Sequence, residues 1–270
     1  KNTPQNKRPK AIIVVHFSGY PAELDKIFNL SKIYDFKIIE DASHALGASF
    51  KKTMIGSNKF SDITVFSFHP VKMITTGEGG LALTNDTKLK DKLKLFRTHG
   101  ITNEKKIMTK TPANEIWNYQ QISLGHNFRL NDFQAALGIS QLKKLPHFLK
   151  KRQGIVNFYK DKLKNLPLYF QESKKDHISS NHLFVINLNK EYEHMQKHIY
   201  SFLLKNGIGC NIHYIPIFLQ PYFKSLNYEF FDCPNSISYF KRTLTLPLHV
   251  NLSKKDQVQV VNTVHEAFEN

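Results

Sequence analysis

Lys72 is the residue of this sequence best placed to do chemistry. It lies between a short apolar run, residues 63–66, and the glycine-rich stretch at residues 77–80. Burial lowers the pKa of a lysine, and a neutral amine can form a Schiff base with an aldehyde cofactor. A lysine is rarely buried, however, so a solvated surface residue is the commoner outcome for Lys72 taken alone. Its neighbours in the sequence decide between these two interpretations.

Three further side chains could share a ligand with Lys72. Asp41 ends an apolar strand pattern, and ligands bind at the carboxyl ends of strands in open α/β sheets. Its carboxylate could pair with a cationic ring nitrogen, although a helix N-cap or a surface acid explains it equally well. His44 could pack on the same ligand or hydrogen-bond to it, and Ser67 could hydrogen-bond a phosphate. Each of these two residues, taken alone, more often has a structural role.

The elements that would hold these residues alternate between strand and helix. Apolar runs predict strands over residues 11–15, 36–41, 63–68 and 81–84, and helical spacing predicts helices over 21–34 and 88–97. The continuous apolar run at 11–15 is typical of a strand that is covered on both faces. This order of elements predicts an α/β domain with a mainly parallel sheet.

The second half of the chain has a different pattern. Residues 101–120 show no period and are expected to form a loop. Asn131 and Asp132 are good N-caps for a long helix, which Pro146 must kink or restart. A smaller α+β unit is expected beyond it, with strands over 183–188, 208–213 and 244–246 and helices over 193–205 and 254–268, the last capped by Ser253.

Composition limits the class of protein. The 270 residues are 41% hydrophobic and 22% charged, which is typical of a soluble globular protein, and no apolar run is long enough to cross a membrane. The two cysteines and the lack of a signal-peptide pattern favour a cytoplasmic location.

The net charge of +16 suggests nucleic-acid binding as one alternative. The lysines are scattered and no groove-reading motif is present, so we expect no nucleic-acid partner. A basic surface would equally attract an anionic substrate such as a nucleotide diphosphate.

The motifs around Lys72, taken together and in order, resemble the pyridoxal phosphate (PLP) core of the DegT–StrS family of sugar-nucleotide aminotransferases. The similar blocks cover essentially the whole chain, at residues 40–48, 56–57, 66–72, 75–80, 125–130, 134–138, 213–216 and 246–249. Residues 43–47, 125–131 and 180–183 are most similar to the members that act in pseudaminic acid biosynthesis. Some relatives use PLP for sugar dehydration and carry histidine at the lysine position, and Lys72 argues against that chemistry.

This resemblance implies roles for individual residues. Lys72 would hold PLP covalently, and Asp41 would pair with the pyridinium nitrogen. His44 would lie beside the phenolic side of the ring, and Ser67 would bind the phosphate. Asn127 would bind cofactor and substrate by reaching into the site of a neighbouring subunit, which implies a homodimer.

The resemblance also implies a fold and a domain organisation. The fold would be that of the type I, PLP-dependent aminotransferases. Residues 1–130 would be the remainder of the large PLP-binding domain, 131–160 a long linking helix, and 161–270 the C-terminal small domain. No metal site is implied.

The implied reaction is the transfer of an amino group from L-glutamate to C4 of a UDP-linked 4-keto-6-deoxy sugar. Substrate contacts are expected from a run of four residues, namely Asn211, Ile212, His213 and Tyr214. The family carries a segment upstream of residues 11–15 that supplies further PLP and substrate contacts. We therefore expect this chain to be the C-terminal part of a longer enzyme or a split product, and to bind PLP poorly by itself. Alternatives are a weakly active or inactive fragment, and an aminotransferase of the same fold that acts on another nucleotide-sugar.

Overall fold

The computed structural model describes residues 3–4, 7–109, 115–226 and 233–269. The chain divides into two compact units, Lys1–Leu145 and Pro146–Asn270.

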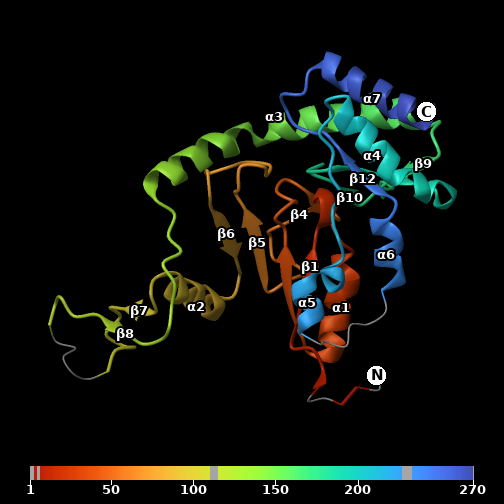
Figure 1. The fold of residues 1–270 in the computed structure, drawn as a ribbon. Coiled ribbons are helices and arrows are strands. Elements are labelled where there is room, and N and C mark those ends of the chain that lie inside the picture. Colours follow the sequence, from red (N-terminus) through yellow and green to blue (C-terminus); the bar gives the residue numbers. More distant parts are fainter. Residues whose placement is uncertain (1–2, 5–6, 110–114, 227–232, 270) are drawn as a thin grey trace. The chain divides into compact units, whose positions relative to one another are not determined.

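A four-stranded sheet in the order β1–β2–β5–β6 forms the centre of the first unit (Figure 1). The strands span Ala11–Val15, Lys37–Asp41, Ile63–Ser67 and Gly80–Leu83. Strands β1, β2 and β5 are parallel, whereas β6 runs antiparallel to β5. This arrangement confirms the prediction of an α/β domain with a mainly parallel sheet. The carboxyl ends of the three parallel strands meet at one edge, because Asp41 is in register with both Val15 and Val65.

One face of this sheet packs against helix α1 (Leu24–Tyr34) and the short strands β3 (Ser49–Phe50) and β4 (Thr53–Met54). On the other face, the described residues leave Ile13 65% and Val15 52% exposed. The prediction that this strand is covered on both faces is therefore wrong for the described part of the chain. Helix α1 begins three residues later than predicted from Pro21, because a turn precedes it (η2, Phe17–Gly19).

The rest of the first unit carries α2 (Thr87–Arg97), whose N-cap Asp86 accepts hydrogen bonds from the backbone of the first turn. The stretch predicted as a loop contains two paired two-residue strands, β7 (Ile101–Thr102) and β8 (Gln120–Gln121). Part of that stretch, residues 110–114, lies outside the described residues.

Helix α3 (Asp132–Leu163) runs from the first unit into the second. The prediction that Pro146 restarts the helix is wrong, since Asp132–Leu163 is one continuous helix with the proline inside it. A kink at Pro146, where one backbone hydrogen bond is lost, stays a prediction.

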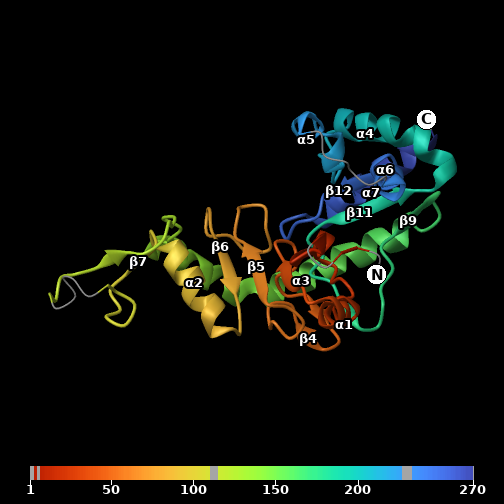
Figure 2. The same ribbon diagram turned by 90° about the horizontal axis from the view of Figure 1, so that it is seen from below.

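The second unit is built on an antiparallel sheet in the order β12–β11–β9, with α4 and α7 side by side (Figure 2). Its elements in chain order are β9 (Leu168–Phe170), β10 (His177–Ile178), β11 (Phe184–Leu188), η3 (Lys190–Met195), α4 (Gln196–Lys205), η4 (Ile217–Leu219), α5 (Pro221–Ser225), α6 (Pro234–Phe240), β12 (Thr243–Leu246) and α7 (Lys254–Glu269). Its apolar core packs around Tyr159, whose hydroxyl donates to the Pro247 carbonyl at 3.1 Å.

Two further predictions are decided in this unit. The predicted strand at 208–213 is wrong, because this segment forms only a single bridge, between Asn211 and Thr245. The predicted cap of the last helix is confirmed, since the Ser253 hydroxyl accepts from the Asp256 N–H at 3.1 Å. In the described part of the chain, no helix combines the length and apolar character that crossing a bilayer requires.

Candidate active site

Lys72 lies in a tightly held loop that joins β5 to β6. The Phe68 N–H donates to the Gly79 carbonyl at 2.9 Å, and the Thr76 N–H donates to the Phe68 carbonyl at 3.0 Å. Met73 and Ile74, which follow the lysine directly, are each only 4% exposed. Because the chain is fixed on both sides of it, Lys72 extends from a well-defined backbone position.

The glycine-rich end of the loop allows close packing against α3. A Cβ atom at Gly79 would lie 2.3 Å from the Thr76 hydroxyl oxygen, which is occupied in donating to the Glu78 carbonyl at 2.7 Å. That same carbonyl accepts a second hydrogen bond, from the Gln134 side chain at 3.0 Å. Gly79 therefore has a steric reason, which the sequence alone did not show.

Asp41 and Lys72 interact electrostatically. Partial burial lowers the pKa of the Lys72 amine below its usual value, and the nearby Asp41 carboxylate opposes that shift. Burial is the larger of the two effects, so the neutral amine is favoured more than in water. The Asp41 carboxylate is itself oriented by the Ser43 N–H, which donates to its Oδ1 at 3.0 Å. The structure thus brings together the two residues on which the sequence prediction depends most.

His44 and Ser67 lie at the same sheet edge as Asp41. His44 is buried, and its Nδ1 accepts a hydrogen bond from the Ser18 N–H at 3.3 Å. In the neutral ring the proton must then be on Nε2, which makes that atom a donor. Ser67 ends strand β5, and its hydroxyl accepts from the His69 N–H at 3.4 Å.

Asn127 lies on an exposed segment of the first unit. It bridges Thr98, and its side-chain oxygen accepts from Arg129 Nε at 2.7 Å. The rings of His126 and Phe128 stack beside it at a centroid distance of 4.6 Å. None of these interactions is with the Lys72 loop.

The four residues predicted to contact substrate belong to the second unit. Asn211 exchanges two backbone hydrogen bonds with Thr245, and its side chain accepts from the Ile212 N–H at 2.8 Å. His213 Nδ1 lies 2.8 Å from the Thr245 hydroxyl oxygen, and the Tyr214 ring is largely exposed. Strand β12 therefore holds this run through Thr245.

Sequence reasoning missed a buried polar cluster beneath Asp41. His16 and Glu40 are 0% and 2% exposed, and His16 Nε2 lies 2.8 Å from Glu40 Oε2. The signal was present in the sequence as a histidine directly after one apolar strand and a glutamate within the next. The sequence pattern marked Glu40 only as one of two carboxylates at a strand end and gave no role to His16.

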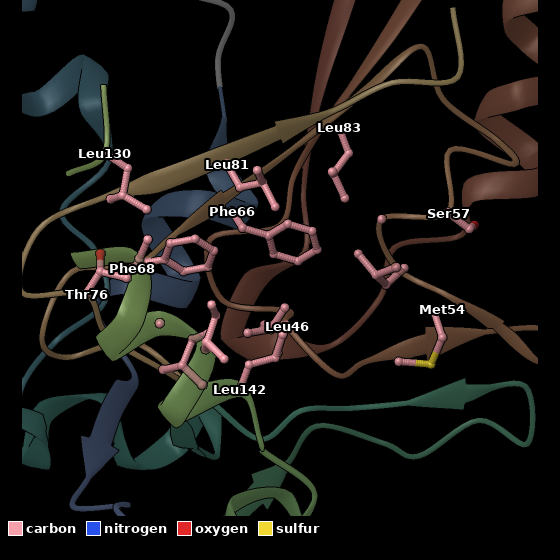
Figure 3. Close-up of a pocket in the computed structure, with 16 residues that line it drawn as sticks. Leu46, Met54, Ser57, Phe66, Phe68, Thr76, Leu81, Leu83, Leu130 and Leu142 are labelled. Carbon is pink, nitrogen blue, oxygen red and sulfur yellow. The ribbon is translucent and has the colours of Figure 1, made fainter. Parts of the chain in front are cut away.

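An apolar cavity of the first unit is not lined by the four predicted site residues Asp41, His44, Ser67 and Lys72. It measures about 610 Å³ and lies between strands β5 and β6 and the start of α3 (Figure 3). Phe68 and Thr76 of the lysine loop line it. Its lining contains no charged side chain.

The chemistry of the site fits pyridoxal phosphate. An amine of lowered pKa, a carboxylate coupled to it, an imidazole donor and a hydroxyl are the groups needed for its aldehyde, ring nitrogen, phenolic oxygen and phosphate respectively. All four come from the ends of strands β2 and β5 or from the segments that follow them, at the carboxyl edge of the sheet, where α/β proteins bind ligands.

Comparison with known proteins supports pyridoxal phosphate as the cofactor. The sequence profile of the DegT/DnrJ/EryC1/StrS aminotransferase family matches residues 3–265. A UDP-4-amino-4,6-dideoxy-N-acetyl-beta-L-altrosamine transaminase of Campylobacter jejuni is 40% identical over 260 residues, which cover 96% of this chain and 66% of that protein. The chain thus spans just under two thirds of the length of that relative.

Solved structures share the fold. Helicobacter pylori PseC, an aminotransferase involved in the biosynthesis of pseudoaminic acid, matches with a TM-score of 0.87 and 33% identity over 96% of this chain and 67% of its own. The PLP-form of the putative sugar aminotransferase Spr1654 of Streptococcus pneumoniae matches with a TM-score of 0.84 and 27% identity over 96% and 68%. The fold is therefore that of the PLP-dependent aminotransferases, and this chain belongs to the DegT/DnrJ/EryC1/StrS aminotransferase family, whose cofactor is pyridoxal phosphate.

Proposed function

We propose that this chain carries the PLP-binding and catalytic groups of an aminotransferase that moves the amino group of L-glutamate to C4 of a UDP-linked 4-keto-6-deoxy sugar. The observation that carries the proposal is the electrostatic coupling of Lys72, with its lowered pKa, to Asp41 at the carboxyl edge of the sheet. The names of the Campylobacter and Helicobacter relatives support the sugar class.

Each residue of the site has a distinct task in this reaction. Pyridoxal phosphate, when bound, supplies an electron sink for negative charge at the carbon that carries the amine. Asp41 would keep the ring nitrogen protonated, and His44 would donate from Nε2 to the phenolic oxygen. Ser67 would hydrogen-bond the phosphate. The amine of Lys72, once released by the incoming amino donor, would take the proton from the donor's Cα as a general base.

The substrate would be held in part by the second unit. We assign the nucleotide-sugar contacts to Asn211, Ile212, His213 and Tyr214. The hydrogen bonds of this run to Thr245 fix its backbone, and the exposed ring of Tyr214 can stack on a ligand.

Asn127 would act in the site of a second copy of the chain. The segment around it exposes large apolar side chains, among them Trp117 at 72% and Phe128 at 70%. Exposed aromatic residues are typical of interfaces, so they support a homodimer in which each Asn127 completes the partner's site. Light scattering on the Phe128→Asp variant tests this, with a shift from dimer to monomer expected. An unchanged dimer in that variant would remove the support.

A second reading of the same site is an aminotransferase for a different nucleotide-sugar, since the solved relative Spr1654 is named only as a putative sugar aminotransferase. A third is weak cofactor binding by the 270-residue chain, which the exposed Ile13 and Val15 on the open face of the sheet favour.

Amine transfer from L-glutamate to a panel of 4-keto UDP-sugars separates these readings. Turnover of the 4-keto-6-deoxy sugar is expected, and it should be abolished by Lys72→Ala. Turnover that survives Lys72→Ala would mean that the site is wrongly assigned.

A further inference from the structure

The buried pair of His16 and Glu40 has no role in the reaction proposed above. Glu40 nevertheless directly precedes Asp41, a residue of the proposed site. Glu40 Oε2 lies 2.8 Å from His16 Nε2, and Glu40 Oε1 accepts from Thr64 Oγ1 at 3.2 Å and from the Ser61 hydroxyl at close range. A buried carboxylate is costly unless donors surround it, and these three donors satisfy both of its oxygens.

The hydrogen bonds of His16 define its tautomer. The Ala22 N–H donates to His16 Nδ1 at 3.0 Å, so Nδ1 is unprotonated and Nε2 carries the hydrogen that is donated to Glu40. The backbone N–H of His16 donates to the Asp41 carbonyl at 3.1 Å. One side chain therefore fastens both ends of the loop from residue 16 to residue 22 and ties the loop to strand β2.

The fastened loop holds Ser18 in an unusual conformation. Ser18 has φ 61° and ψ 4°, a left-handed conformation that serine adopts only when its surroundings impose it. In this conformation its N–H points at His44 Nδ1, at 3.3 Å. The Phe17 ring lies against His44 as well, with centroids 6.2 Å apart.

We propose that the buried His16–Glu40 pair is a positioning device for His44. The pair holds the loop in the conformation in which the Ser18 N–H occupies His44 Nδ1, and this fixes the ring orientation and leaves Nε2 as the donor toward the phenolic oxygen of the cofactor. His16 and Glu40 are positioning residues rather than catalytic ones. The inference rests on the proposed function in one respect, the role of His44 at the cofactor.

Cofactor-free protein provides the first test. Amide hydrogen exchange at Ser18 and Ala22 is measured in the full 270-residue chain and in the His16→Leu variant, with Ser31→Ala as a matched control. Ser31 is also buried in the first unit and donates to the Phe28 carbonyl at 2.7 Å, but its hydrogen bond does not involve the loop. Exchange at both amides should rise at least about tenfold in His16→Leu, because one ordinary hydrogen bond that holds the loop is lost. It should stay unchanged in Ser31→Ala. Unchanged exchange in a folded His16→Leu chain overturns the proposal.

A double-mutant cycle separates positioning from mere structural support. A glutamine at position 44 has an amide donor that needs no tautomer, so His44→Gln should make cofactor binding independent of His16. The dissociation constant of PLP, followed by its absorbance, should rise about tenfold on His16→Leu in the His44 protein but less than twofold in the His44→Gln background. Equal weakening in both backgrounds would show structural support alone and overturn the proposal.

Two outcomes remain to be distinguished. If the chain binds no PLP at all, the proposed function fails, while the exchange measurement still decides whether His16 holds the loop. If His16→Leu does not fold, Ala22→Pro replaces it, because that change removes the N–H donated to His16 Nδ1 and leaves the buried pair intact. The same rise in exchange at Ser18 is then expected, and its absence overturns the proposal.

Discussion

Gly125 lies where two segments of the first unit cross with no room for a side chain. A Cβ atom at Gly125 would lie 2.1 Å from the Gly100 nitrogen and 2.5 Å from the His99 carbonyl carbon. Ordinary contacts of this kind are about 3.5–4.0 Å long, so Gly125→Ala must push the segments apart by more than about 1 Å. Two hydrogen bonds join the segments here, His126 N–H to the Phe96 carbonyl at 2.7 Å and His99 N–H to the His126 carbonyl at 2.8 Å. A displacement of that size breaks both.

The cost follows from these contacts. Two lost hydrogen bonds at about 1 kcal/mol each, with about 1 kcal/mol of overpacking, lower the free energy of local opening by about 3 kcal/mol. Exchange of the His99 and His126 amides should then be more than about 100-fold faster, as hydrogen-exchange mass spectrometry or NMR can measure. Because Asn127 directly follows His126, its proposed role in the partner's site should weaken in parallel.

Gly154→Ala is the matched control for this prediction. Gly154 lies within α3, and a Cβ atom there meets nothing within 4 Å. Alanine is the better helix former, so this change should stabilise the second unit by about 0.5–1 kcal/mol and leave exchange at His99 and His126 unaltered. Equal exchange at those two amides in Gly125→Ala and in the unmodified chain would refute the reasoning.

Three other substitutions have defined outcomes. Burial lowers the pKa of Lys72 from its usual 10.5, so the unfolded chain binds that proton more tightly. Lys72→Gln should therefore raise the free energy of unfolding at pH 7, and urea titrations should show this gain fading as the pH rises from the lowered pKa toward 10.5 and absent above it. Arg152 is buried, and one of its guanidinium nitrogens donates to three backbone carbonyls at 3.0–3.2 Å, so Arg152→Leu should lower the stability of the second unit by about 2–4 kcal/mol in the same assay. Ser253→Ala removes the cap of α7 and should cost about 0.5–2 kcal/mol by thermal unfolding, whereas Ser253→Asp should cost little.

Local pattern was sufficient to predict much of the fold. The runs at residues 11–15, 36–41 and 63–68 form β1, β2 and β5 to within one residue at each end. A short apolar run that is rich in β-branched and aromatic residues and bounded by polar ones is typical of a buried strand. The α/β rhythm then dictated a parallel sheet, and Asp41 and Ser67 at the ends of their strands were brought to one edge by that topology alone.

Long-range contacts account for the features that were not predicted. The apolar alternation at 208–213 resembles a strand, but only Asn211 finds a partner, so the ladder stops after one bridge. The Ala22 N–H, just before α1, donates to His16 Nδ1, and a partner six residues away leaves no local signal in the sequence. The pairing of His16 with Glu40 depends on the register of β1 and β2, which the sequence does not state.

The central claim is that Lys72 is the amine that binds the cofactor, and reductive trapping tests it most directly. The 270-residue chain is incubated with PLP, treated with borohydride so that bound cofactor is fixed to the amine that holds it, and digested for peptide mass spectrometry. One phosphopyridoxyl group on the peptide that contains Lys72 is the predicted result, and Asp41→Asn should reduce its yield. Label spread over the many exposed lysines, with none enriched at Lys72, would contradict the account.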